Sequence, residues 1–402
     1  MTWYNPVSWF RSGPPKNVTA AQLADLFADY IGKTSSGVSV NPNTAQKASA
    51  VFACIRLLGG AVAGLPCPTF VDGRSGRELD KTIPAYRLLN VEPSPLMTAA
   101  VFWETVVHHI HSYGGAYALI DRVGSVPDAL YLIEPNAVSI ELKDNRWRYY
   151  VRLLNGQFRA FDQDDILHFH NIFFDVSTGK TMSTIRGIAE SIGLSLAAEQ
   201  YTGRFFGNNV HSDMVAECDG TMTIEALGLL RKQINERNAG LDKAFMPLVG
   251  QGGLKFKRLG ITAEDAQLIE AREFQVEDIA RGFGVPPHMI GATSKTTSWG
   301  SGIEQQSIGF VTYTLAPMLT RFEQEINRKL IRRGDAFCEF AVAGLLRGDS
   351  KARADAYKIA RGSMQEPGYM TINEIRKLEN LPPIPGGDVL QQPTTGGTTN
   401  AE

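Results

Sequence analysis

The chain has 402 residues, of which 43% are hydrophobic and 20% charged, enough for two or three domains with substantial cores. Its net charge of −2 excludes the overall basic excess of proteins that grip nucleic acid through many phosphate contacts. The four cysteines show neither metal-ligand nor redox spacing, so we expect reduced, buried thiols at Cys54, Cys67, Cys218 and Cys338.

Residues 1–40 are punctuated by Pro, Gly and Ser and contain one short amphipathic patch near residues 20–31. The first residues lack the basic start and continuous apolar run of a signal peptide. We predict an N-terminal arm in which Trp3, Trp9 and Phe10 are possible docking anchors.

Residues 44–65 form the first predicted helix, with Thr44 as a plausible N-cap. Residues 48–65 carry one charge, Arg56, and are almost long enough to span a membrane, where Gly60 and Gly64 would suggest helix pairing. A charge near the middle and prolines directly after the run argue against a span. We therefore predict a buried core helix and no membrane contact.

Helical and strand patterns mix from there to about residue 210, which predicts an α+β fold. A strand near 67–72 precedes a helix at about 97–113. Six short alternating stretches between residues 116 and 170 are typical of strands separated by turns. A helix rich in small residues, at about 188–207, closes this part.

Residues 223–240 predict a further helix, which Thr223 caps and Gly240 ends. Two strand-like pieces follow and predict a hairpin across residues 250–253. The hairpin is locally basic, because it carries Lys255, Lys257 and Arg258 together with Lys243 against a single acid.

An acidic helix is predicted at 262–283, where Thr262 and Asp265 form a capping box. Its apolar residues recur at helical spacing and form one stripe, made of Ala266, Ile269, Val276, Ile279, Ala280 and Phe283. Glu270, Glu273 and Glu277 are among the six acids around that stripe, against two arginines. Such a helix suits lateral packing in an assembly and says little about catalysis.

A loop of Ser, Thr and Gly at 292–302 separates this helix from a longer one at 303–333, roughly 45 Å long at about 1.5 Å per residue. Pro317 should kink or break the longer helix because it lacks a backbone N–H. Further on, a helix at 351–361 precedes a short helix that Thr371 and Glu374 cap. The residues after Pro385 have too little apolar content to fold alone.

No motif specifies a catalytic or cofactor site. The stretch STGKT at 177–181 has Phe174 where a phosphate-binding loop needs its first glycine, so we interpret it as a surface turn. His108 and His111 share a helix face and His168 and His170 a strand face, but neither pair has an acid or cysteine at metal-site spacing. We predict that the chain is not an enzyme and holds no cofactor or metal.

Four stretches, in this order, resemble the portal protein family of tailed double-stranded DNA bacteriophages, in its siphophage-type subfamily. The most specific is GGLKFKRLGITAEDAQLIEAREFQVEDIARGFGVPPHMIG at 252–291, which contains an FGVPP turn. The others are VFACIRLLGGAVAGLP (51–66), DDILHFH (164–170) and GYMTINEIRKLENLPPIPGGD (368–388). The resemblance covers about residues 44–385. It implies a portal-type α+β fold with a mixed α/β wing, a helical stem, a small α/β clip and a helical crown.

The resemblance further implies a ring of twelve identical subunits at one capsid vertex, through which double-stranded DNA enters and leaves. The ring would contact the major capsid protein or scaffold and dock the terminase large subunit, then head-completion or tail adaptor proteins. It would assemble in the host cytoplasm and remain in the virion. Its expected parts are an arm (1–40), wing (41–222), stem helix (223–240), clip (241–260), stem helix (261–290), tunnel loop (291–302), kinked spine and wing return (303–346), crown (347–383) and flexible tail (384–402).

The candidate site residues follow from this assignment. A channel that passes DNA cannot hold phosphates tightly, so acids at Glu270, Glu273 and Glu277 would form a repelling wall. The expected DNA-facing residues of the tunnel loop and clip are Lys295, Thr296, Thr297, Ser298, Trp299, Lys255, Lys257 and Arg258. The clip residues could equally meet an acidic motor surface or only solvent.

Two other functions stay open from the sequence. One is a packaging ATPase or nuclease, which would need a working phosphate loop or an acidic metal cluster. The other is a minor capsid protein that binds shell subunits and encloses no channel.

Overall fold

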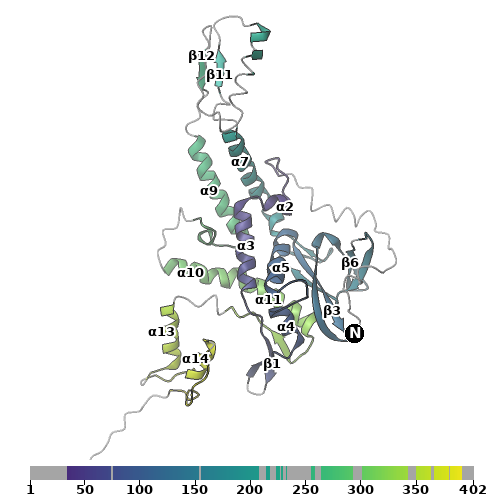
Figure 1. Ribbon diagram of the computed structural model, residues 1–402, viewed down its shortest axis with the longest axis vertical. Coiled ribbons are helices and arrows are strands. Elements are labelled where there is room, and N and C mark those ends of the chain that lie inside the picture. The colour runs from purple at the N-terminus through teal and green to yellow at the C-terminus, as the bar shows by residue number, and fades with distance from the viewer. Residues whose placement is uncertain are drawn as a thin grey trace, which may run out of the picture. The chain divides into compact units, whose positions relative to one another are not determined.

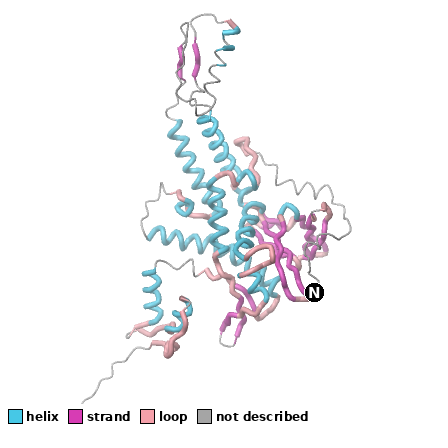
Figure 2. Tube along the Cα trace, viewed as in Figure 1, coloured by secondary structure: helices cyan, strands magenta, loops and turns pink. Residues whose placement is uncertain are grey.

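Figure 1 shows the computed structural model of the chain, which describes residues 34–73, 76–153, 155–207, 214–217, 223–226, 228–229, 232, 255–258, 264–292, 301–342, 350–363, 366–379 and 381–391. The chain forms two compact units, Met1–Thr297 with Thr312–Phe340, and Ser298–Val311 with Ala341–Glu402. Every described strand belongs to the first unit, where helices and strands mix (Figure 2). The predicted α+β class is therefore confirmed.

The described helical elements that lie wholly in the first unit are α2 (Pro42–Ala45), α3 (Ser49–Ala63), α4 (Pro84–Asn90), α5 (Ala99–Tyr113), the 3-10 turn η2 (Pro135–Ala137), α6 (Thr184–Gly187), α7 (Ala189–Gly207), α9 (Glu264–Phe283), the 3-10 turn η4 (Pro287–Ile290), α11 (Ala316–Ile326) and the π-helical η6 (Asn327–Ile331). Its strands are β1 (Thr69–Gly73), β2 (Gly76–Leu79), β3 (Gly115–Val123), β4 (Val126–Ile133), β5 (Val138–Lys143), β6 (Arg146–Arg152), β7 (Phe158–Asp162), β8 (Ile166–His170), β9 (Phe174–Asp175), β10 (Lys180–Thr181), β11 (Met214–Glu217), β12 (Lys255–Arg258) and β13 (Ala336–Cys338).

The first predicted helix is confirmed but is split into α2 and α3. Asn41, and not Thr44, is the N-cap of α2: its side chain accepts from the N–H of Thr44, whose hydroxyl accepts from the N–H of Asn41. The prediction placed the cap three residues too late because Thr44 supplies the other half of the capping box.

Helix α3 packs against α5 inside the unit. Gly59 faces Glu104 of α5, and a Cβ there would lie 3.6 Å from the Cα of Glu104, an ordinary van der Waals distance, so this approach does not require a glycine. Gly60 faces open space instead. Within the described residues, no helix combines the length and apolar character needed to cross a bilayer. Cys54, Cys67 and Cys338 are free and buried, as predicted for these three thiols.

The described strands form three three-stranded antiparallel sheets, in the orders β4-β3-β8, β5-β6-β7 and β13-β1-β2, and two two-stranded ones, β9 with β10 and β11 with β12. All six alternating stretches predicted between residues 116 and 170 are strands. In the first sheet, Tyr117 of β3 lies opposite His168 of β8. Both side chains are buried, so this register brings polar groups into the interior.

An aromatic cluster fills the centre of the first unit. The ring of Trp103 stacks on Phe322 of α11 at a centroid distance of 5.9 Å and meets Phe169 of β8 edge-on. The indole N–H donates to the carbonyl of Leu89 at 3.1 Å, so the one polar atom of this side chain is satisfied. The cluster therefore joins α5, α11 and β8 into one core.

Helices α7 and α9 lie side by side and run antiparallel (Figures 1 and 2). Ser191 near the start of α7 donates to Asp278 in the last turns of α9, and Gly282 lies against Ile188. The described partner of the predicted stem helix is thus α7, within the predicted wing. The predicted helix at 223–240 lies mostly outside the described residues, so these domain boundaries stay predictions.

The predicted long helix is present, with helical residues from 301 to 331, but it is not a simple kinked rod. It contains α10 (Ser301–Gly309), the π-helical η5 (Phe310–Leu315), α11 and the π-helical η6. The first π-helical segment ends two residues before Pro317. A proline lacks the N–H of one helical hydrogen bond. A π-helical segment just before it shifts the hydrogen-bond pattern, so the helix can continue past the proline.

The second unit contains α13 (Ser350–Arg361) and α14 (Ile372–Leu378) besides α10. Thr371 and Glu374 form the predicted capping box of α14. Asn373 accepts from the N–H of Ile384 and donates to its carbonyl and to Asp388. Residues 384–391, which the sequence assigns to the tail, are thus held against α14 at least through residue 388.

Candidate functional site

Helix α9, the predicted stem helix, has one buried and one exposed face. Of the described residues of the predicted apolar stripe, Ile279, Ala280 and Phe283 are buried and Val276 is half-buried; the polar Gln275, outside that stripe, is buried as well. Phe274 on the opposite face is 53% exposed and lies under the guanidinium of Arg281. The buried face packs on α3 and α7, so the exposed face remains for contacts outside the first unit.

The candidate channel acids differ in their surroundings. Glu273 is exposed, and Glu277, one turn later, is half-buried. Both border a groove of about 530 Å³, whose wall includes Ala50 and Ala53 of α3 and Ile290 of η4. Glu270 lies in α9, but its side chain is outside the described residues. Helical spacing places all three on adjacent turns of one face.

The candidate clip residues Lys255, Lys257 and Arg258 lie in β12, which pairs with β11. Lys255 is opposite Glu217 and Arg258 opposite Met214. The sequence predicts a different partner for this strand, at 244–250, which lies outside the described residues. The pairing with β11 spans about 40 residues of chain, so local strand patterns could not reveal it.

The tunnel-loop candidates Lys295, Thr296, Thr297, Ser298 and Trp299 all lie outside the described residues. The FGVPP turn just before them, at residues 283–287, lies within the described residues. Gly284 has a φ of +68°, and its carbonyl accepts from the hydroxyl of Thr314 in η5 at 2.6 Å. Val285 is buried, and its N–H donates to the carbonyl of Ala280. The end of α9 is therefore fastened to a π-helical turn of the long helix.

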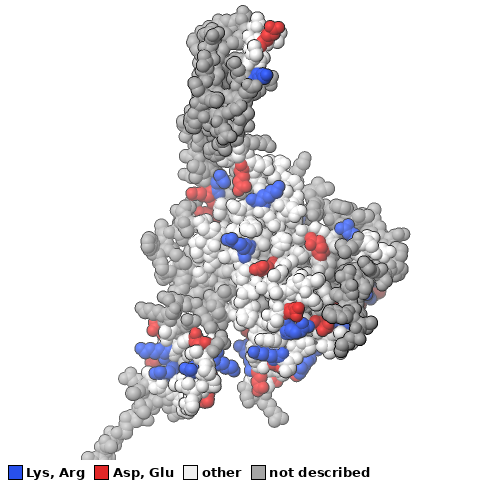
Figure 3. Space-filling model, in the orientation of Figure 1, with Lys and Arg blue, Asp and Glu red and all other residues white. Residues whose placement is uncertain are grey.

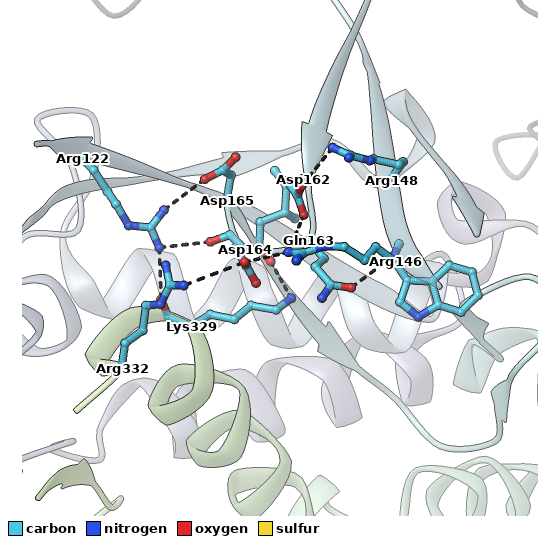
Figure 4. Close-up of polar contacts among 11 residues, drawn as sticks. Arg122, Arg146, Arg148, Asp162, Gln163, Asp164, Asp165, Lys329 and Arg332 are labelled. Atoms are coloured by element: carbon cyan, nitrogen blue, oxygen red, sulfur yellow. Dashed lines mark hydrogen bonds and ion pairs between the residues drawn. The ribbon is translucent and has the colours of Figure 1, made fainter. Parts of the chain in front are cut away.

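A charged joint connects the sheets of the predicted wing to η6 (Figure 4). Arg122 of β3 donates to the carboxylate of Asp165 at 3.2 Å and to the carbonyls of Asp164 and Lys329, each at 3.0 Å. Arg146 of β6 reaches Asp164 at 2.8 Å. The motif DDILHFH thus supplies acids that join two sheets and a helix end.

The second half of this joint centres on Asp162, at the end of β7. Its carboxylate pairs with Arg146 at 3.0 Å and with Arg148 at 2.9 Å (Figure 4). Desolvation alone would raise the pKa of Asp162, but the hydrogen bond and charge of Arg146 hold the pKa below its usual value. Because these ion pairs are partly exposed, they orient the side chains of β6 and β7 but contribute little to the free energy of unfolding.

Below this network lies a buried ion pair that sequence reasoning missed. Lys329 of η6 is 3% exposed; its ammonium lies 2.5 Å from Glu325 and donates to the carbonyl of Ile166 at 2.7 Å. Glu325 also accepts from the N–H of His168 at 2.8 Å. Burial lowers the pKa of Lys329, although Glu325 opposes that shift. The spacing of four residues between Glu325 and Lys329 indicates that the two side chains can pair on a helix, but it does not indicate that the pair is buried.

The buried histidines are kept neutral. Burial, followed by the charges of His170 and Lys329, lowers the pKa of His168 well below its ordinary value. Burial also lowers the pKa of His111 to about 4. His111 hydrogen-bonds Thr184 at 2.9 Å, as expected of an interior histidine. Within the described residues, no three His, Cys, Asp or Glu side chains gather in a way that could hold a metal.

The stretch STGKT forms a tight hairpin turn, as interpreted from the sequence. Asp175 accepts from the N–H and hydroxyl of Ser177 and from the hydroxyl of Thr178. Gly179 lies against Trp147, where a Cβ would come within 2.8 Å of the ring. The carboxylate of Asp175 therefore already accepts the Ser177 N–H and the two hydroxyls of this turn.

Acidic and basic side chains are interspersed over the described surface in the view of Figure 3. This distribution matches the net charge of −2. The described face in that view therefore offers no extended basic track for DNA.

The comparisons with known proteins agree on one family. The profile of the phage portal protein family matches residues 49–380. The portal protein of Enterobacteria phage HK97 is 33% identical to the chain over 416 aligned positions, which cover 100% of this chain and 95% of that protein.

Two sets of solved structures share the fold. A gene transfer agent neck computed with C6 symmetry matches with a TM-score of 0.60 at 19% identity, over 92% of this chain and 96% of that one. A second neck, computed with C12 symmetry, matches with a TM-score of 0.59 at 18% identity, over 94% of this chain and 98% of that one. A crystal structure of an HK97 family phage portal protein from Corynebacterium diphtheriae matches with a TM-score of 0.55 at 19% identity, over 75% of this chain and 95% of that one. The chain belongs to the phage portal protein family, a structural class of bacteriophage capsid proteins.

Proposed function

We propose that this chain forms a ring at one vertex of a phage capsid and that double-stranded DNA passes through its centre during packaging and ejection. Membership in the portal family is the observation that carries this proposal. Twelve copies are proposed because necks with the same fold were computed with C6 and with C12 symmetry, and a ring of twelve is compatible with both. The exposed face of α9 is available for lateral contacts, as ring formation requires.

Within this ring, Glu270, Glu273 and Glu277 would line the channel. Carboxylates repel the phosphate backbone, and a surface that forms no phosphate contacts lets the duplex slide. The exposure of Glu273 and the shared helix face support this placement. Lys295 to Trp299 would touch the duplex transiently, and Lys255, Lys257 and Arg258 would meet DNA or an acidic surface of the packaging motor.

The proposed partners are those that act at such a vertex. The terminase large subunit would dock during packaging, and a head-completion or adaptor protein would replace it afterwards. The major capsid protein or scaffold would surround the ring, which would assemble in the host cytoplasm. Purified chain mixed with each partner, followed by measurement of complex mass, tests these contacts one at a time.

The mass of the assembled particle tests the ring directly. Native mass spectrometry should give a species of about twelve times the chain mass of 44.0 kDa. A chain that stays monomeric at all concentrations, and also inside virus heads, contradicts the proposal. Nucleotide turnover by the purified chain would instead favour the packaging ATPase, and a closed lattice would favour a shell protein without a channel.

A further inference from the structure

A pocket of about 380 Å³ opens beside the β9–β10 hairpin in the first unit. Tyr113 at the end of α5, Tyr117 of β3 and Phe173 before the hairpin contribute aromatic rings to its lining. Half of the lining residues are polar or charged, among them Asn136 and Arg186. Aromatic walls combined with hydrogen-bonding groups suit an indole side chain, which is apolar and carries one N–H donor.

Phe173 is an unusual residue on the rim of this pocket. Its φ is +58°, a left-handed conformation that costs free energy for a bulky side chain. Its ring is nevertheless 72% exposed. Ile172 and Val176 beside it are 45% and 72% exposed. A strained backbone that presents apolar side chains to solvent gains no contact from the described residues around it, which indicates that another segment covers them.

The hairpin is held firmly in this conformation. The N–H of Asn171 donates to the hydroxyl of Thr181 at 3.1 Å, and its amide donates to the carbonyl of Met182 at 2.9 Å. Thr181 in turn donates to the carbonyl of Gly114. The ring of Phe174 meets Trp147 edge-on. A preorganised apolar rim of this kind binds with little loss of conformational entropy.

The N-terminal segment of the chain is the occupant that the described contacts favour. The described residues begin at Thr34, which lies against Gly193, and the N–H of Ser35 donates to Glu190 at 3.0 Å. Glu190 is four residues after Arg186, which lines the pocket. Thr34, where residues 1–33 join the described chain, therefore lies beside the helix that follows Arg186. At roughly 3.3 Å per residue, residues 1–33 can reach up to about 100 Å.

The composition of that segment fits the pocket. Four of its first ten residues are large aromatics, Trp3, Tyr4, Trp9 and Phe10. Aromatic side chains carry most of the binding free energy where a peptide fills a pocket of this lining. We propose that the Trp9–Phe10 part of the N-terminal segment docks into the pocket beside Phe173 and covers the exposed rim of the hairpin. This contact is independent of ring formation.

Photo-crosslinking in the full chain tests the docking. Phe10 is replaced by benzoylphenylalanine, the chain is irradiated, and the adducts are mapped by mass spectrometry. We expect adducts within residues 113–117 and 172–186. Phe173→Asp should lower their yield at least tenfold. Val123→Asp is the matched control, because Val123 is 71% exposed at the far end of β3, outside the pocket lining, and it should leave the yield unchanged.

Phe173→Gly guards against a folding defect, because glycine accepts a φ of +58° without strain. It should keep the thermal midpoint at or above that of the parent and still lower the adduct yield severalfold. Adducts that map to other surfaces, or only to a different protein, overturn the proposal. So does a yield that neither Phe173 variant lowers.

Discussion

The aromatic core around Trp103 and the surface formed by α9 and the β9–β10 hairpin follow opposite rules. In the core, Trp103 and Phe322 are both nearly fully buried, and the one polar atom of the indole is hydrogen-bonded. On the surface, Phe274 and Phe173 are 53% and 72% exposed, and Glu273 faces solvent. The contacts that bury the core side chains are all made within one chain. The exposed side chains on the surface are left for contacts outside this core, with other subunits at α9 and with the N-terminal segment at the hairpin, so changes there should alter those contacts and leave folding intact.

The largest effect is expected for Trp103→Ala. It removes the stacked indole and its hydrogen bond and leaves a cavity, which should lower the free energy of unfolding by about 3–5 kcal/mol. Phe274→Ala is the matched control: this ring is half exposed and should change the free energy of unfolding by less than about 0.5 kcal/mol. Denaturant unfolding of both variants measures the difference, and similar losses would erase the contrast between the two regions.

Lys329→Met should come next, with a loss of about 3 kcal/mol, because it leaves Glu325 buried without a counter-charge. The N–H of His168 still donates to Glu325, which keeps the loss at the lower end of the usual range. The double variant Lys329→Met with Glu325→Leu should recover much of the loss in the same unfolding measurement. A double variant no more stable than the single one would show that the ion pair itself holds η6 to β8.

Acid should lower the free energy of unfolding by about 2 kcal/mol for each of three interior histidines between pH 7 and pH 4.5. Burial lowers the folded-state pKa of His109, His111 and His170 to about 4, whereas an unfolded chain binds the proton near pH 6.5. The contribution of these neutral histidines is therefore complete above pH 6.5 and is lost as pH falls toward 4. Unfolding curves at several pH values measure this slope, and a flat profile would place these imidazoles in solvent.

Charge reversal on the surface should change stability by less than about 1 kcal/mol but change DNA handling. Glu270→Lys with Glu273→Lys and Glu277→Lys should make the ring retain duplex DNA and slow packaging. For each phosphate that the new lysines contact, the logarithm of the affinity for DNA should fall more steeply with the logarithm of the salt concentration, by about 0.9 in slope.

A triple control at Glu78, Glu92 and Glu141, all on wing strands or turns, changes the net charge equally. It should leave packaging at the parental rate. Equal slowing by both triple variants would show a general charge effect and count against an acidic channel wall.

Deletion of residues 293–301 should have the smallest effect on the particle. Rings should assemble normally, since the deletion spares α9 and nearly all of α10, while packaged DNA should slip back. Particle imaging and the retained genome length measure the two outcomes separately. Failure to assemble would assign this segment to structure and not to DNA contact.

The sequence predicted local features well where one segment determines them. The capping box of Thr371 and Glu374 and the apolar stripe of α9 are as expected, because caps and helical periodicity are local signals. It missed features that depend on distant contacts. The pairing of β12 with β11 and the burial of Lys329 fall in this class, since each needs a partner far along the chain. Phe173 was missed because no pattern of side chains signals a left-handed φ at phenylalanine.

Electron microscopy of the purified chain tests most directly whether it forms a ring around a passage for DNA. Class averages should show hollow particles with high rotational symmetry. We expect twelvefold symmetry, as in the neck that was computed with C12 symmetry. Monomers, solid particles or a closed lattice, under conditions where the chain is folded and concentrated, would contradict this account.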